Sequence, residues 1–402
     1  AAEGTAPLFA KHVVKGEKTQ AWNIVVDASA QYGGVVGDLG DLGDGAKADI
    51  HVGFLNNSAV VGGDTAGGIC GSMGEKSELN LWLDENIKDT SGKDTTSQSL
   101  GSVTANDFAG GVIGQMNTGS VLTIKGMPKI TSERTITATD GNSGNAAGGL
   151  IGKANSAKIE FAKDVSYTNR GELNAKVEKN SSTNSAPSES GAGGVFGVYS
   201  AAEGAEFNID LSDYKFEKEI TVSANAGGGF AGRFELKGLD ENKKAANITI
   251  GKENAENSCF NVTADAGTVG GILGKLLTNE SCLENTVTIK NVKTNVTIND
   301  NKVNGGGIVG DLGWYNESKG RTYLKIEGTN NITINGGEHK ETGNTGGIAY
   351  SVYSGFLDIC GENTISGKVR SGVVDKVVDC NKYGNYGSVV RFSGITDLKG
   401  VT

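Results

Sequence analysis

Gly148-Gly149-Leu150-Ile151-Gly152 is one of nine copies of a single phrase: Gly-Gly, two apolar residues, then Gly. First glycines of successive copies lie 34 to 45 residues apart, and the ninth copy replaces its last glycine by Tyr350. The copies begin at Gly33, Gly67, Gly110, Gly148, Gly193, Gly228, Gly270, Gly306 and Gly346. A phrase that recurs with a period of about 20–50 residues is typical of stacked units that cannot bury their apolar faces alone. The sequence therefore predicts one elongated repeat protein.

The segments between the phrases have the pattern of short strands. Residues 323–327 (YLKIE) and 331–335 (NITIN) alternate apolar and polar side chains, and Gly/Asn clusters separate such runs. Helical periodicity is nearly absent. We expect an all-β fold, a right-handed parallel β-helix of about nine to ten three-stranded coils. The expected organisation is a single domain over 1–402, with an incomplete N-terminal coil or cap at 1–32, repeats at 33–386 and a worn coil at 387–402.

The phrase itself suggests two structural roles. We expect its Gly-Gly pair to turn the chain with positive φ and to let neighbouring coils approach closely. Its apolar positions should form one internal ladder from coil to coil. The residues of that ladder are Ile69, Val112, Leu150, Val195, Ile272 and Ile308.

Composition argues against several partners. The chain has 402 residues, 63 of them Gly and only 3 Pro, and its net charge is −10. An acidic balance disfavours nucleic acid and anionic membrane surfaces. No 20-residue apolar run or polybasic stretch is present, so we expect no direct membrane insertion. Because the chain begins at Ala1 without Met, we interpret it as a mature or excised segment with flanking domains.

Residues for catalysis or cofactor binding are sparse. The three histidines, His12, His51 and His339, are not near a repeated acid, so we predict no catalytic residue and no cofactor. The loop from Asp38 to Gly45 carries three Asp at spacing three, which leaves Ca²⁺ binding open, but a solvated acidic turn is favoured. We expect no metal site. We expect Cys70, which occupies an apolar position of the phrase, to be a core residue. The sequence leaves open whether disulfides form among the other four cysteines, Cys259, Cys282, Cys360 and Cys380.

The phrase followed by Asn/Thr-rich strands resembles the GLUG-type repeats of bacterial surface and adhesin-like proteins. The resemblance covers Gly33 to about Gly347. Copies here run longer than that family's usual repeat and lack its Tyr-rich tail after the third glycine. The resemblance implies a secreted, surface-associated β-solenoid that serves as a spacer or adhesive part of a larger protein. It implies no catalytic residue.

Aromatic residues gather in the corner after the phrase and suggest a binding edge. Trp314, Tyr315, Tyr353 and Tyr199 are the candidate ligand-binding residues, because rigid exposed aromatics are common platforms for sugars and proteins. The alternative is that each ring folds back over its own corner.

Three functions remain open from the sequence. The favoured one is an extracellular, cell-surface or wall-associated adhesin or stalk segment that binds a surface glycan or protein without catalysis. The second is a polysaccharide lyase or glycoside hydrolase, which requires at least three charged side chains converging across neighbouring coils. The third is a purely mechanical spacer or filament subunit.

Overall fold

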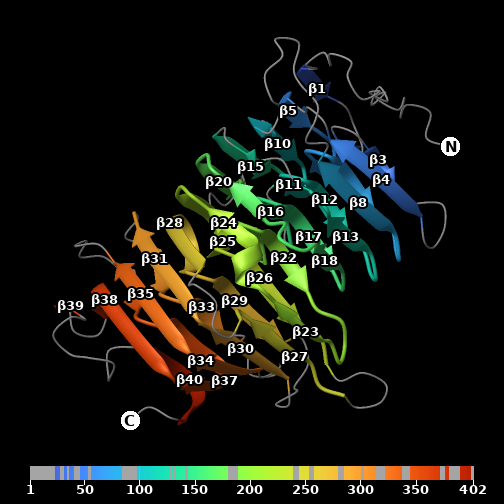
Figure 1. Ribbon diagram of the computed structural model, residues 1–402. Helices are drawn as coiled ribbons and strands as arrows, with labels where there is room; N and C mark the ends of the chain where they lie inside the picture. The colour runs from blue at the N-terminus through green and yellow to red at the C-terminus, as the bar shows by residue number, and fades with distance from the viewer. Residues whose placement is uncertain are drawn as a thin grey trace.

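The chain forms a stack of parallel strands (Figure 1). The structure, a computed structural model, describes residues 23–27, 31–33, 36–39, 46–52, 56–83, 97–98, 100–126, 129–130, 133–140, 144–179, 189–238, 244–252, 258–278, 285–299, 303–313, 322–336, 345–371, 376–379 and 390–399. In each coil the chain passes through up to five short strands and then returns to pair with the coil before it. The prediction of an all-β, parallel repeat fold is confirmed.

Strands of successive coils form five stacks, numbered here in the order in which the chain visits them. The first stack comprises β1 (Asn23–Asp27), β5 (Asn56–Val61), β10 (Ser102–Ala105), β15 (Arg134–Ala138), β20 (Leu173–Val177), β25 (Ile220–Gly228), β28 (Ser258–Gly270), β31 (Val292–Ile298), β35 (Thr329–Asn335) and β38 (Glu362–Ser371). The second stack comprises β2 (Gln31–Gly33), β6 (Thr65–Gly67), β11 (Phe108–Gly110), β16 (Ala146–Gly148), β21 (Gly191–Gly193), the ends of β25 and β28, β32 (Asn304–Gly306) and β36 (Thr345–Gly346).

The third stack follows the Gly-Gly bend. It comprises β3 (Val36–Leu39), β7 (Cys70–Met73), β12 (Ile113–Met116), β17 (Ile151–Asn155), β22 (Phe196–Ser200), β26 (Ala231–Leu236), β29 (Leu273–Thr278), β33 (Val309–Leu312), β37 (Ala349–Ile359) and β40 (Val390–Lys399). Its described strands pair in parallel without interruption.

The fourth stack is divided into two parts. One is β4 (Lys47–Val52), β8 (Glu78–Leu83), β13 (Val121–Ile124) and β18 (Lys158–Phe161); the other is β23 (Glu206–Ile209), β27 (Asn247–Ile250), β30 (Thr286–Lys290), β34 (Thr322–Glu327) and the ends of β37 and β40. The fifth stack comprises β9 (Ser97–Gln98), β14 (Lys129–Ile130), β19 (Tyr167–Asn169) and β24 (Tyr214–Phe216). A 3₁₀ helix, η1 (Leu211–Asp213), precedes β24.

The three-stranded coil is too simple a description of these repeats. The four coils from β5 to β24 each contain five short strands, because the strand before Gly-Gly is split and a fifth stack is added. In addition, β39 (Lys376–Asp379) pairs antiparallel with β38, the one antiparallel pairing among the described strands. The sequence did not reveal these additions because such strands are only two to four residues long.

The glycines of the phrase are required by close approach and not by an unusual backbone. A Cβ on Gly149 would lie 2.2 Å from the Gly194 carbonyl oxygen of the next coil, and a Cβ on Gly148 would lie 1.9 Å from the Ile151 oxygen of its own coil. No described glycine of the phrase has a positive φ. The expected coil-to-coil approach is therefore confirmed, whereas the expected left-handed turn is wrong.

The apolar ladder is confirmed in full. The Val112 amide donates to Leu150 O at 2.9 Å, and the Leu150 amide donates to Val195 O at 3.1 Å. Phe230 and Ile348 continue the same ladder. All six predicted members have no exposed surface: Ile69, Val112, Leu150, Val195, Ile272 and Ile308.

Replacing Val195 by Asp tests this ladder. The change buries a charge with no partner and should cost several kcal/mol of unfolding free energy. The exposed Lys176→Asp change on β20 is the control and should cost only about 1 kcal/mol, because it breaks an exposed ion pair with Glu178 and buries no charge. Thermal or urea unfolding measures both. An unchanged melting temperature for Val195→Asp would contradict the register.

Candidate functional site

The structure places the four predicted aromatic residues differently. Tyr199 on β22 is 5% exposed and its ring stacks on Phe234 at 4.9 Å, so the expectation that it presents a free surface ring is wrong. Tyr353 on β37 is partly buried, and burial raises its pKa to about 12. Trp314 and Tyr315 lie outside the described residues. The four rings are therefore not brought together as one described surface.

A local interruption of the fourth stack is the most distinctive feature of the described surface. The strands β18 and β23 belong to consecutive coils, yet each ends its own run of paired strands. On both sides of this position the same two coils remain paired, β17 with β22 and β19 with β24. The coils are thus separated over one strand only (Figure 1).

Chain length and side-chain size explain the separation. The chain takes two more residues from Ser200 to Tyr214 than between the register-matched Asn155 and Tyr167. Tyr199 is matched with the small Ala154 of the preceding coil, and its hydroxyl donates to the Ala157 carbonyl at 3.1 Å. We infer that the longer connection and the larger ring move β23 away from β18.

The interruption forms a cleft of about 980 Å³. Its floor is aromatic: the Phe161 and Tyr214 ring centroids are 5.3 Å apart, and those of Phe196 and Tyr199 are 5.0 Å apart. The inward apolar residues of the intact neighbours β13 and β27 are fully buried, namely Leu122, Ile124, Ile248 and Ile250. Those of the strands that flank the cleft are only partly buried, namely Ile159, Phe161, Phe207 and Ile209.

Charged residues of two coils meet at one end of the cleft. Asp210 accepts hydrogen bonds from the Ser212 amide and hydroxyl, and forms an ion pair with Lys252 of the next coil at 2.9 Å. Burial raises the pKa of Asp210 while hydrogen bonds from Ser212 and Lys252 lower it, and the net direction is down. Burial, followed by the Asp210 carboxylate, raises the pKa of Asp213 to about 6.

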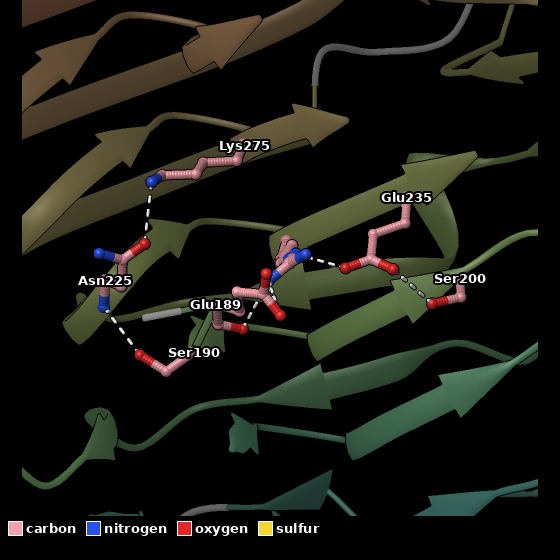
Figure 2. A network of polar contacts seen from close by, with 7 residues as sticks. Glu189, Ser190, Ser200, Asn225, Glu235 and Lys275 are labelled. Atoms are coloured by element: carbon pink, nitrogen blue, oxygen red, sulfur yellow. Dashed lines mark hydrogen bonds and ion pairs between the residues drawn. The ribbon is translucent and has the colours of Figure 1, made fainter. Parts of the chain in front are cut away.

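A second polar cluster lies along the third stack (Figure 2). It is organised by the residue directly after the phrase, which is in register from Arg233 to Lys275 to Asp311. Arg233 forms an ion pair with Glu235, and Lys275 lies 3.5 Å from a carboxylate oxygen of Asp311. The Lys275 ammonium also donates to Asn225 at 2.8 Å.

This polar ladder is largely buried and internally paired. Arg233 donates to the Glu189 carbonyl oxygen at 2.9 Å, Ser200 donates to Glu235 at 3.1 Å, and Ser351 donates to Asp311 at 2.9 Å. Because these partners satisfy one another across coils, we assign the ladder a structural role and not a binding role.

Cation and thiol chemistry is limited in the described part of the chain. No group of three or more His, Cys, Asp or Glu residues is placed there to hold a metal ion. Asp41 and Asp44 of the acidic loop lie outside the described residues, as do Cys282 and Cys380. Cys70 is buried as expected, and Cys259 and Cys360 are free thiols. Among the described residues no helix has the length and apolarity needed to cross a membrane.

Comparison of the chain with known protein families, curated proteins and solved structures finds no match. The assignment of function therefore depends on the geometry of the chain itself.

Glu235→Ala tests the structural role of the polar ladder. The change leaves the Arg233 guanidinium, whose side chain is 6% exposed, without its nearest carboxylate and should cost about 3 kcal/mol. Glu178→Ala is the matched control, because it removes one partner of an exposed pair with Lys176 and should cost less than about 1 kcal/mol. Equal losses in urea unfolding would rule out the assigned role.

Asp213→Asn tests the electrostatics of the cleft. Because the folded-state pKa of Asp213 is raised to about 6, the folded protein holds this proton more tightly than the unfolded chain does. The associated stability is present below pH 4 and is lost as pH rises through about 6. Asp213→Asn should therefore raise the melting temperature at pH 7.5 and change it little at pH 4. Asp164→Asn at the cleft rim is the control, and an identical response of the two variants would refute the prediction.

Proposed function

We propose that this chain is a non-catalytic, extracellular binding segment, an adhesin or stalk of a bacterial surface protein, with the winding of a right-handed parallel β-helix. The observation that supports binding is the cleft between β18 and β23, where partly buried apolar residues line an interruption in an otherwise continuous stack. A partner bound in this cleft would remove that apolar surface from water, which contributes about 25 cal/mol of favourable free energy for each Å² buried. The proposed partner is a surface glycan or protein.

A glycoside hydrolase or lyase is the second candidate. Asp210, Asp213 and Lys252 bring three charged groups from neighbouring coils to one cleft, and Asp213 has the raised pKa of a general acid. Against this role, Asp210 is already engaged in capping η1 and in its ion pair with Lys252. The purely mechanical spacer is the third candidate, for which the cleft would have no ligand.

The experiment is a binding screen of the whole chain against surface glycans and surface proteins at near-physiological salt. We expect a ligand whose binding Phe207→Ser weakens at least tenfold while the variant keeps a cooperative melting transition. Trp314→Ala and Tyr353→Ala serve as the comparison, since they test the corner predicted from sequence. If only these two variants lose binding, the binding site is the aromatic corner after the phrase and not the cleft.

Two further outcomes would overturn the proposal. Cleavage of a polysaccharide that is abolished by Asp213→Asn would favour the enzyme. End-to-end association of the chain without binding to any member of the panel would favour the mechanical spacer.

A further inference from the structure

Two strand edges without a strand partner face each other across the cleft. The Lys158 amide donates to Ser120 O and the Ala162 amide to Ile124 O, so these residues face β13. Because successive residues of a strand point their backbone groups to opposite sides, the groups of Ile159 and Phe161 face the cleft. Within the described residues β18 has no partner on that side.

The opposite edge has the same property. The Asn247 amide donates to Ala205 O and the Gly251 amide to Ile209 O, which places Ala205 and Ile209 toward β27. The backbone groups of Glu206 and Asn208 therefore face the cleft. The described chain supplies no strand to pair with them. Two edges, each four residues long, thus offer donors and acceptors to the same space.

The ladders of inward apolar side chains are interrupted at the same place, between the two edges. In the intact part of the fourth stack, two inward apolar residues per strand form continuous ladders, as in the pairs Ile248↔Val287 and Ile250↔Ile289. At the cleft, both ladders stop at Ile159 and Phe161 and resume at Phe207 and Ile209, and all four residues are only partly buried. An inserted segment with two apolar residues at alternate positions would continue both ladders.

The aromatic floor is poorly suited to a sugar. Carbohydrate recognition requires the open face of a ring, yet Tyr199 and Tyr214 are each 5% exposed. One face of Tyr199 is already covered by Phe234. Phe161 meets Tyr214 edge to face. What the cleft offers outward is therefore backbone hydrogen bonding and alternating apolar contact, which together are the requirements of a β-strand.

We propose that the cleft binds one extended polypeptide strand of a partner protein, which pairs with both β18 and β23 and completes the fourth stack. This inference rests on the proposed binding function and specifies its partner. The bound segment spans at least four residues, about 13 Å, has aliphatic residues at two alternate positions and contains no proline. Lys158 and Glu160 alternate in charge along the rim, so the polar positions of the segment need no single sign.

The probe is a fluorescent peptide with the sequence of residues 285–291, NTVTIKN, which contains β30 (Thr286–Lys290), a fully paired strand of the same stack. Fluorescence anisotropy with the full chain should show saturable binding. A peptide with Ser in place of its Val and Ile should bind at least tenfold more weakly. A peptide N-methylated at its central Thr and Ile, which cannot pair on either side, should also bind at least tenfold more weakly.

Two substitutions at one position locate the peptide. Asn208→Pro removes an amide that faces the cleft and is compatible with an edge strand, so it should weaken binding at least tenfold. Asn208→Ala keeps that amide and should bind within about twofold of the wild type. Because the peptide can also add to the end coils, only the component that is sensitive to Asn208→Pro supports the inference.

The outcomes separate this inference from the proposed function. Unchanged binding of the N-methylated peptide, or of Asn208→Pro when its melting temperature is retained, overturns strand pairing. A glycan whose binding Phe207→Ser abolishes, with no peptide bound, also overturns the inference but leaves the binding function intact. If neither the peptide nor any member of the surface panel binds, both the strand-pairing inference and the proposed binding function are overturned.

Discussion

The fold depends on one close contact, the approach of glycine backbones at the bend of each coil. At Gly149 and Gly194 a single added Cβ would lie 2.2 Å from the carbonyl oxygen of the next coil. Side chains are excluded there, so the coils can stack only in the register that superposes the glycines. The apolar ladder within the phrase and the polar ladder directly after it both follow from this register, because the residues of each ladder lie at a constant spacing from the glycines.

A fixed register at the bend allows irregularity elsewhere. The coils that contain β18 and β23 remain tied through the third and fifth stacks, so two extra residues and a larger ring separate them at one place without changing the stacking beyond it. The cost is exposure of apolar residues that neighbouring coils bury. In the proposed function a partner recovers that burial, and recognition is concentrated where the repeat departs from its own pattern.

The regular part of this structure could be predicted from sequence and the cleft could not. The phrase predicted parallel stacking and all six residues named for the apolar ladder, Val195 among them. By contrast, residues 158–161 (KIEF) and 206–209 (EFNI) have the same alternation as strands that do pair. Two features of the sequence mark the break: the longer connection after Ser200, and Tyr199 at the position that Ala154 occupies in the preceding coil. Both can be recognised only when the register of the coils is already known.

Two other residues show the same limit. Arg134 is fully buried and donates to Gly149 O, the Tyr167 hydroxyl and Asn169 Oδ1, yet its Ser-Glu-Arg-Thr context is that of a surface residue. Tyr199 was predicted to be a binding residue, and it does line the cleft, but as part of the floor. Burial of polar or aromatic side chains depends on the partner coil, which the local sequence does not specify.

Residue-resolved amide hydrogen exchange of the free chain is the most direct test of the interruption. We predict fast exchange at Ile159 and Phe161 of β18 and at Glu206 and Asn208 of β23, because these amides have no strand partner among the described residues. The amides of Lys158 and Glu160 should exchange slowly, as should those of β13 and β27. Uniformly slow exchange along β18 and β23 would show that the fourth stack is continuous and that the cleft between these strands does not exist.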